Sequence, residues 1–307
     1  MATRRPVDLG LTLGALQHGG RRDPCVRVGP RELWRASDTR DGPATLHLRS
    51  VDATTIEARA WGPGAACALE GVPDLVGADD DAPPLDGVHP LVTELATRLA
   101  GLRIGRTDAV MDALVPTVLA QRVIGAEACR AHVAMVRAAG RPAPRPTDRD
   151  VIDAQLDAPA LLLPPEPRWL MSTPSWTFHR WGVERRRART IQIAVSYAHR
   201  FADPADVGLD EVRRRLSALP GVGPWTVNNV AMLALGDPDA VSVGDYWLKH
   251  VVSYALTGEP RGTDERMLEL LEPWKGQRGR VCRLLLRGGP ALPRFGPRLP
   301  LRNLAAH

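Results

Sequence analysis

The chain has 307 residues, a formal net charge of +5 and 44% hydrophobic residues, so it is long enough for a large core and two or three subdomains. No stretch reaches the length of a transmembrane helix, and no apolar run follows the N-terminal Met-Ala-Thr-Arg-Arg, so neither a membrane protein nor a secreted one is expected. Of its 40 basic residues only Lys249 and Lys275 are lysines, which is typical of coding bias. The positive charge therefore permits a nucleic-acid partner without requiring one.

The first part of the chain, up to about residue 75, alternates apolar and polar residues as half-exposed β-strands do. Residues 45–49 and 55–60 show this two-residue period, and shorter candidate strands flank Gly29 and Pro30. Residues 65–69 are predicted to form a short helix. We expect a β-rich N-terminal domain, which together with its linker covers residues 1–87.

Residues 78–87 form an acidic segment broken by prolines, which we interpret as that linker. Three successive aspartates, Asp79 to Asp81, could suggest a metal site, but no spaced partners follow and a solvated loop is the favoured interpretation. The cysteines lie far apart, without metal-ligand spacing, and are expected to be reduced thiols. Their positions are 25, 67, 129 and 282.

From His89 onward the hydrophobic spacing predicts helices. Leu91, Leu95, Leu99 and Leu102 share one face of the first. Further helices are predicted over residues 108–121, 126–139, 185–200, 264–271 and 281–286. A proline-rich connection over residues 141–165 joins the helical halves. Four aromatic residues follow it, most of them expected in the core: Trp169, Trp176, Phe178 and Trp181.

The basic residues are concentrated in the second part of the chain. Residues 1–100 hold 11 arginines and 14 acidic residues, whereas residues 274–307 hold eight basic residues and no acidic one. A second basic cluster consists of Arg185, Arg186, Arg187 and Arg189. This distribution suits a face that binds a polyanion, with an ordinary solvated surface as the alternative.

The most informative stretch lies between residues 209 and 250. Leu209, Val212, Leu216 and Leu219 share a face of one predicted helix. A second helix is predicted from Pro224, a residue suited to the first helical position. The turn between them is Pro-Gly-Val-Gly, and the N–H groups at a helix N-terminus attract phosphate, so the turn is a candidate phosphate site. A plain helix–turn–helix corner explains these four residues equally well.

The whole stretch resembles the hairpin of the helix-hairpin-helix (HhH-GPD) DNA glycosylase superfamily. That family has Leu-Pro-Gly-Val-Gly, a helix, a short loop and a catalytic aspartate before another helix; residues 219–223, 225–235 and Asp245 match these parts. The pairs Trp225-Thr226 and Asp245-Tyr246 are similar to those of the inducible bacterial 3-methyladenine DNA glycosylases (glycosylase II). The resemblance covers residues 100–290 well and residues 1–90 only in general character.

The resemblance implies a mainly α-helical fold with an N-terminal β-rich (α+β) domain. A helical HhH glycosylase domain is expected over residues 88–290, followed by a loosely ordered basic tail over residues 291–307. The implied catalytic residue is Asp245, whose carboxylate would stabilise positive charge on the sugar as the bond between C1′ and the base breaks. Its alternative role is to cap a helix, since residues 242–245 resemble a capping box. Asp237 and Asp239 lie close to Asp245 in the sequence and are alternative candidates for the catalytic carboxylate. Their Gly-Asp-Pro-Asp context is, however, typical of a turn.

Other residues are assigned to the base pocket or to DNA binding. Trp225 is the first candidate for the pocket, followed by Trp247 and Trp176, because electron-rich rings attract a cationic alkylated base. Leu286 stands where this branch has an aromatic residue. DNA contacts are expected from Gly221, Val222, Gly223, Thr226, Gln121, Arg122 and Lys249. Arg122 replaces an apolar wedge residue, so it either fills the gap left by the flipped base or contacts phosphate.

The implied function is a monofunctional DNA glycosylase that removes damaged bases, of the alkylated 3-methyladenine type, from double-stranded DNA in base excision repair. Trp225 occupies the position where bifunctional relatives have a nucleophilic lysine, so no lyase activity is expected. The alternatives are a glycosylase for a deaminated or oxidised base, and a non-catalytic DNA-binding protein that keeps the fold.

No cofactor and no metal held by side chains is expected. The resemblance implies at most a structural monovalent cation at the backbone carbonyls of Leu219 and Val222. We expect a monomer that works in the cytoplasm on the nucleoid, without a membrane partner.

Overall fold

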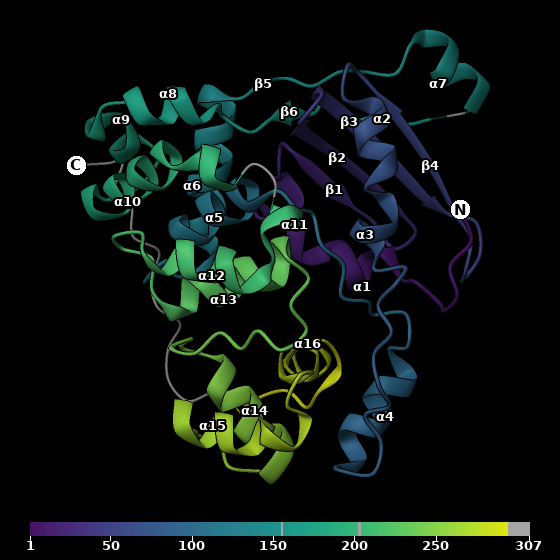
Figure 1. Cartoon of the computed structure of the whole chain (residues 1–307), viewed down its shortest axis with the longest axis vertical. Coiled ribbons are helices and arrows are strands. Elements are labelled where there is room, and N and C mark those ends of the chain that lie inside the picture. Colours follow the sequence, from purple (N-terminus) through teal and green to yellow (C-terminus); the bar gives the residue numbers. More distant parts are fainter. Residues whose placement is uncertain (155, 202–203, 294–307) are drawn as a thin grey trace.

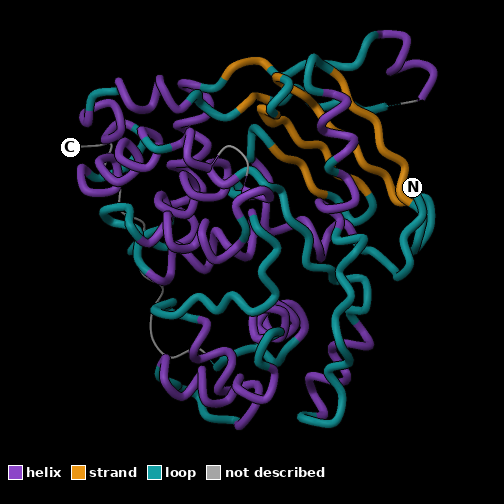
Figure 2. The backbone as a smooth tube through the Cα atoms, viewed as in Figure 1, coloured by secondary structure: helices purple, strands orange, loops and turns teal. Residues whose placement is uncertain are grey.

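The computed structural model describes residues 1–154, 156–201 and 204–293, and this part is mainly helical, with a four-stranded sheet and a two-stranded one, β5-β6 (Figures 1 and 2). The strands are β1 (Val26–Val28), β2 (Glu32–Thr39), β3 (Gly42–Ser50), β4 (Ile56–Trp61), β5 (Arg141–Pro142) and β6 (Leu162–Leu163). The first helices are α1 (Leu9–Leu13), α2 (Ala65–Glu70), α3 (Val72–Val76), α4 (Pro90–Arg98), α5 (Val110–Leu119), α6 (Gly125–Ala139), α7 (Asp148–Ala154) and α8 (Pro167–Ser172). The others are α9 (Ser175–Arg180), α10 (Arg185–Ser196), α11 (Pro204–Val207), α12 (Leu209–Ser217), α13 (Pro224–Ala234), α14 (Leu248–Thr257), α15 (Asp264–Leu271) and α16 (Arg278–Gly288). Four 3₁₀ turns complete the set: η1 (Gly14–Leu16), η2 (Gly20–Arg22), η3 (Ala198–Phe201) and η4 (Glu272–Trp274).

The N-terminal sheet is antiparallel with strands in sequence order, β1-β2-β3-β4, as hairpin connections produce. The prediction that its strands are half-exposed is wrong for β3, where five successive residues from Ala44 to Leu48 are buried. On one face Leu46 and Leu48 enter the main core. On the other, the His47 ring stacks on Trp34 with centroids 4.1 Å apart. Both faces are therefore covered by protein.

The main core continues from the sheet into the helices without a break at the predicted linker. Leu33 and Leu48 of the sheet share it with Leu114 of α5, Met135 of α6 and Val230 of α13, all essentially inaccessible to solvent. Burial of this apolar surface is what holds the sheet to the helical part. The boundary at residue 87 thus remains a prediction, because no separate core marks it.

A second core lies at the other end of the molecule, in the lower part of Figure 1, and consists of helices from both ends of the helical region. Leu95 of α4 packs there with Val252 of α14, Met267 of α15 and Val281 of α16. The helix that begins the helical region therefore joins the last three. Figure 2 shows the connection between α13 and α14 as a loop that runs from the upper helices to the lower ones.

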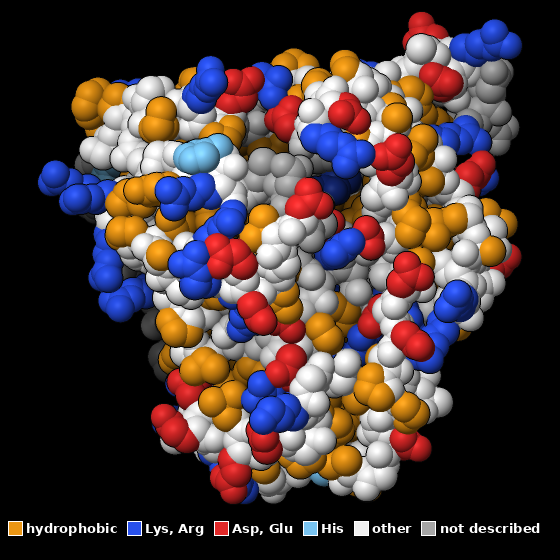
Figure 3. Space-filling model, viewed as in Figure 1, with side chains coloured by type: hydrophobic (Ala, Val, Ile, Leu, Met, Phe, Trp, Pro, Cys, Tyr) orange, Lys and Arg blue, Asp and Glu red, His pale blue; other side chains and the backbone are white. Residues whose placement is uncertain are grey.

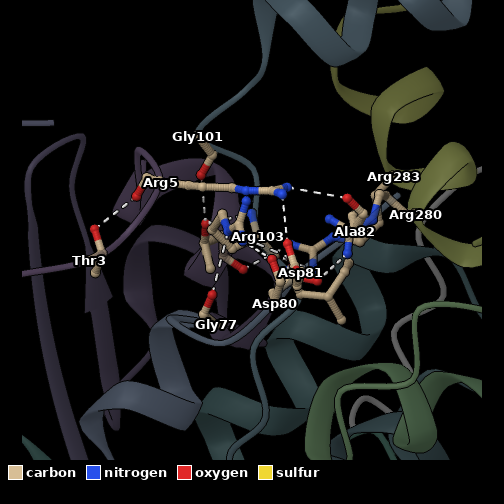
Figure 4. Close-up of polar contacts among 12 residues, drawn as sticks. Thr3, Arg5, Gly77, Asp80, Asp81, Ala82, Gly101, Arg103, Arg280 and Arg283 are labelled. Atoms are coloured by element: carbon tan, nitrogen blue, oxygen red, sulfur yellow. Dashed lines mark hydrogen bonds and ion pairs between the residues drawn. The ribbon is translucent and has the colours of Figure 1, made fainter. Parts of the chain in front are cut away.

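The acidic linker holds these parts together, which corrects the expectation of a solvated loop (Figure 4). The Asp80 side chain is 10% exposed and forms ion pairs with Arg103 and with Arg280 of α16. One Asp80 oxygen also accepts the Ile104 amide at 2.8 Å. A buried carboxylate needs such partners, and removing them would leave a buried charge uncompensated. Asp81 behaves as expected, with an exposed ion pair to Arg5.

Several basic residues of the second half also serve the fold. Arg187, expected on a basic face, is 2% exposed and donates hydrogen bonds to the carbonyls of Leu119 and Gly182. Arg283 is buried and donates to the carbonyls of Leu11 and Thr12. Burial lowers the pKa of Arg283 to about 10, helped by the neighbouring arginine charges. These cations therefore cannot be counted toward a polyanion-binding surface.

The remaining helical predictions hold within a few residues. The helix predicted over residues 264–271 is α15, and the short helix predicted at 65–69 is α2. Leu209 is exposed rather than part of the buried face of α12, which Val212 and Leu216 form. From residue 294 on, the predicted basic tail lies outside the described residues. Within the described part of the chain, no helix is long and apolar enough to span a membrane.

Candidate active site

The hairpin consists of α12, the turn at residues 218–223 and α13. Pro224 takes the first position of α13 as predicted, where its missing N–H costs no hydrogen bond. Gly223 precedes it and has no side chain to cap the first turn, so the Trp225 and Thr226 amides have no partner within the helix. Gly221 and Gly223 are both exposed, whereas the side chains of Val222 and Thr226 are buried. Any DNA contact at Val222 or Thr226 therefore involves backbone.

The two glycines of the turn differ in what they require. Gly221 has φ of +87°, and a Cβ there would lie 2.3 Å from Oγ1 of Thr190, so both backbone conformation and close packing demand glycine. Gly223 has φ of −101°, and a Cβ there would meet nothing within 4 Å. Glycine at 223 is therefore not needed by the fold.

Gln121 connects the hairpin to the turn between α5 and α6. Its side-chain nitrogen donates to the Gly221 carbonyl and to Oγ1 of Thr226, both at 3.0 Å. The next residue, Arg122, is exposed and has φ of +55°, a conformation that costs a non-glycine residue free energy. The structure thus brings the Gln121–Arg122 turn next to the hairpin, a proximity that their separation in sequence does not reveal.

The Asp245 carboxylate is held by three donors. One oxygen accepts the indole N–H of Trp225 at 3.1 Å, and the other accepts the backbone N–H groups of Trp247 and Leu248, each at 2.8 Å. Because α14 begins only at Leu248, the capping box predicted over residues 242–245 does not form. Asp245 instead precedes the helix and binds its first amides, which fixes the direction of the carboxylate.

The two rival carboxylates already have structural partners. Asp237 is buried, is ion-paired with Arg213 and accepts the Asp239 amide, as turn chemistry predicts. Asp239 is ion-paired with Arg278. Burial alone would raise the pKa of Asp239, but its hydrogen bonds to Arg278 outweigh this and lower the pKa overall. Neither carboxylate is free to meet a substrate without giving up an ion pair.

The predicted aromatic residues are not all brought together. Trp225 contacts Asp245 directly, and Trp247 is 45% exposed beside it in sequence. Trp176 lies on α9 and is 66% exposed, and no hydrogen bond or ring contact of the described residues joins it to this site. Tyr246, which the prediction of the pocket omitted, is 76% exposed and packs against the His250 ring edge to face. The position of Tyr246 directly after Asp245 in the sequence could have indicated that it belongs to the site.

Lys249, assigned to DNA binding, has a carboxylate partner. Its Nζ lies 3.4 Å from an Asp264 oxygen, and the other Asp264 oxygen accepts the Gly244 amide at 3.1 Å. Asp264 therefore connects α15 to the loop that carries Asp245. The carbonyl of Leu219, one of the two suggested for a cation, accepts the Val222 amide at 3.0 Å. A carbonyl has a second lone pair, so the cation remains a prediction.

Exposed cations lie close to the hairpin in the fold. Arg185, Arg186 and Arg189 are exposed on α10, the helix whose Thr190 packs against Gly221. Figure 3 shows Lys and Arg side chains gathered at the left edge of the view, beside α10. A cavity of about 580 Å³ lies elsewhere, between the sheet and α5, α6 and α8, and Asp245 does not line it.

No protein-family model matches the chain. A probable bifunctional transcriptional activator/DNA repair enzyme AlkA of Mycobacterium tuberculosis is 33% identical over 184 residues, or 59% of this chain. The match covers 32% of that protein, so the chain spans about a third of the relative's length.

Two solved structures share the fold over almost the whole chain. A 3-methyladenine DNA-glycosylase from Archaeoglobus fulgidus has a TM-score of 0.73 and 15% identity, covering 93% of this chain and 96% of that one. The 8-oxoguanine glycosylase/lyase of Clostridium acetobutylicum, in complex with double-stranded DNA containing cytosine opposite 8-oxoguanine, has a TM-score of 0.61 and 12% identity, covering 92% and 91%. The predicted fold class is confirmed. At these sequence identities the structural similarity supports the fold alone and not the function.

Proposed function

We propose that this chain, a member of the helix-hairpin-helix DNA glycosylase superfamily with an AlkA-like relative, is a monofunctional glycosylase that removes alkylated bases from duplex DNA. The observation that carries the proposal is the Asp245 carboxylate, fixed by the Trp225 indole and two backbone amides directly after the hairpin. Asp245 also holds the first amides of α14, but a helix-hairpin-helix domain that only binds DNA gains no affinity from a carboxylate next to a polyanion.

In this proposal Asp245 acts by electrostatic stabilisation of the transition state. When the bond between C1′ and the base breaks, positive charge develops on the sugar, and a carboxylate already in place stabilises it without reorganisation. The three donors on Asp245 keep it aimed in one direction, which is the preorganisation this role needs. An attacking water oriented by the same carboxylate completes the hydrolysis and leaves an abasic site.

Duplex DNA is held, in this proposal, by the hairpin and the exposed arginines of α10. The uncapped amides at the start of α13 offer hydrogen bonds to one phosphate, and the open space at Gly223 lets the backbone approach it. Exposed cations such as Arg186 and Arg189 add salt-dependent affinity. These contacts position the duplex and do not read its sequence.

The base must leave the stack to reach Asp245, and two features support this step. Arg122 projects from a strained turn attached to the hairpin through Gln121, a suitable place for a residue that fills the vacated gap. The Trp225 indole donates to Asp245, and Tyr246 and Trp247 directly follow Asp245 in the sequence. Aromatic faces attract an alkylated base because it is cationic. Alkylated bases are therefore the favoured substrate class.

The positions of the two lysines support hydrolysis without strand cleavage. Position 225 is tryptophan, and its indole donates to Asp245 instead of attacking the sugar. Lys249 is the nearest lysine in sequence and is ion-paired with Asp264. A Schiff base needs a free amine at C1′, so the proposed product is an intact strand with an abasic site.

The test is base excision by purified wild-type protein and by Asp245→Asn, on duplexes that each contain one defined alkylated, deaminated or oxidised base. Removing one electrostatic contact of this kind costs roughly 100- to 1000-fold in rate, so Asp245→Asn is expected to lose at least that much while binding duplex normally. The matched control is Asp239→Asn, which alters the rival carboxylate and should retain the rate per folded molecule. Substantial excision by Asp245→Asn would remove Asp245 from the mechanism.

The same assay decides between the candidate functions. Excision of an oxidised or deaminated base in preference to alkylated ones would replace the proposed substrate class and keep the mechanism. Duplex binding without excision of any base on the panel would instead favour a non-catalytic protein that has kept the fold.

A further inference from the structure

Three buried side chains with metal-binding atoms meet outside the hairpin, and one of them, His132, lies more than 100 residues along the chain from the other two. Asp23 directly follows η2, Cys25 directly precedes β1, and His132 lies on α6. One ligand atom from each lies within 4.8 Å of the other two. Their exposed fractions are 0%, 5% and 6%. The proposed glycosylase reaction uses none of them.

The hydrogen-bond partners of this cluster are incomplete. Neither ring nitrogen of His132 has a hydrogen-bond partner among the described residues. Its Nε2 lies 3.4 Å from an Asp23 oxygen, an ion-pair distance that does not meet the geometry of a hydrogen bond. Buried polar groups in native proteins are nearly always paired, and an ion bound at the site is one explanation of an exception.

The distance between the imidazole and carboxylate donors suits a tetrahedral metal. Bonds of about 2.0–2.3 Å to nitrogen, oxygen and sulfur put the ligand atoms of a zinc ion roughly 3.3–3.7 Å apart. The observed distance of 3.4 Å between His132 Nε2 and the Asp23 oxygen falls in this range. Imidazole, carboxylate and thiolate are the three side-chain ligands that zinc prefers. We propose that Asp23, Cys25 and His132 bind a zinc ion that joins the N-terminal sheet to α6.

The surroundings of Asp23 are those of a preoriented ligand. One of its oxygens accepts the Gly19 amide at 2.6 Å, and the other accepts the amides of Cys25 and Val26 at 2.8 and 3.1 Å. Hydrogen bonds of this type fix metal-binding carboxylates in known sites. They leave a lone pair for the ion on Oδ2, the oxygen that accepts only the Gly19 amide and lies 3.4 Å from His132 Nε2.

A second imidazole ring, that of His18, lies next to His132. The His18 and His132 rings meet edge to face with centroids 5.8 Å apart. When zinc binds, the Cys25 thiol proton passes to solvent and the thiolate completes the set.

The site's role in this proposal is structural. It joins residues before β1 to a helix whose N-terminus directly follows the strained turn at Arg122. Because the two segments meet only in the folded chain, the free energy of zinc binding adds to the free energy of unfolding. The four cysteine positions show no metal spacing, which is why the sequence does not predict the site.

The experiment begins with the full-length wild-type protein, stripped by a chelator and titrated with Co²⁺ and then Zn²⁺. We expect one tightly bound equivalent, a sulfur-to-cobalt charge-transfer band that zinc abolishes, and a higher melting temperature with zinc. A wild-type protein that binds no such equivalent overturns the proposal, whatever the variants do.

Two serine variants locate the metal. Cys25→Ser should lose the charge-transfer band and weaken zinc binding by more than the roughly 100-fold that follows when a hydrogen bond to a metal ligand is removed. Cys282→Ser removes a thiol that is equally buried but lies in the other core, and should bind zinc as the wild type does. His132→Gln, with circular dichroism as a check on folding, is expected to repeat the loss. An unchanged cobalt spectrum in Cys25→Ser would overturn the assignment.

Discussion

Replacing each hairpin glycine by alanine separates the structural requirement of the turn from its proposed DNA contact. At Gly221 an alanine would be held at φ of +87°, and its Cβ would lie 2.3 Å from the Thr190 hydroxyl. At Gly223 the backbone conformation is ordinary and the space around the Cβ is open. The first variant should therefore lose stability, whereas the second should keep it.

Two contributions determine how much stability Gly221→Ala should lose. A non-glycine residue in a left-handed conformation costs about 1–2 kcal/mol. Thr190 must also move, which endangers its hydrogen bond to the Arg186 carbonyl, worth about 0.5–1.5 kcal/mol. Gly221→Ala should thus lower the free energy of unfolding by about 2–3 kcal/mol, or roughly 4–6 °C in melting temperature for a chain of this length. Gly223→Ala should stay within about 0.5 kcal/mol of the wild type.

The assays are thermal melting and titration with a duplex at fixed salt. Gly223→Ala is expected to melt normally and to bind DNA more weakly, and Gly223→Glu to bind more weakly still, because a carboxylate there repels phosphate. The double variant Gly221→Ala/Thr190→Ala should recover part of the stability by removing the clash. If Gly221→Ala melted like the wild type, the close approach to α10 would be wrong; if Gly223→Glu bound duplex normally, the turn would not be a phosphate site.

Three further outcomes are expected. Trp225→Phe keeps an aromatic ring but removes the donor to Asp245, so excision should slow by roughly tenfold, as the loss of one hydrogen bond to a charged group predicts, with duplex binding unchanged. Borohydride treatment during turnover should trap no covalent adduct with DNA; a trapped adduct that disappears in Lys249→Ala would reveal a lyase. The double variant Arg186→Glu/Arg189→Glu should reduce the slope of log K against log salt by about 0.9 for each phosphate that the protein no longer neutralises, and an unchanged slope would exclude α10 from the DNA face.

The sequence predicted those parts of the fold that depend on local patterns. Pro224 at a helix start, α15 and the antiparallel sheet all follow from periodicity and turn residues within a few positions. Burial of charged groups could not be predicted in this way. Asp80 and Arg187 look like solvated residues in their own segments, and only their partners from distant segments, Arg280 and the Leu119 carbonyl among them, explain their burial.

The same limit applied to the candidate site. Asp245 and the hairpin glycines could be singled out because the family pattern is contiguous in sequence. Two features could not: the hydrogen bond from Trp225 to Asp245 spans 20 residues, and that from Gln121 to the Gly221 carbonyl spans 100. The first residue of α14 could not be predicted either. Because this helix begins at Leu248, residues 242–245 do not form a capping box, and Asp245 lies before the helix.

The position of Asp245 relative to the hairpin depends on how the two cores are joined. Trp225 belongs to a helix of the main core, whereas Asp245 leads into α14 of the second core, so their hydrogen bond crosses between the two. A shift of about 1 Å between reacting groups is enough to slow catalysis greatly. The buried interactions of Asp80 and Arg283 with α16 and the N-terminal segment fix the second core against the first. Residues with no part in the chemistry therefore set the distance on which the proposed chemistry depends.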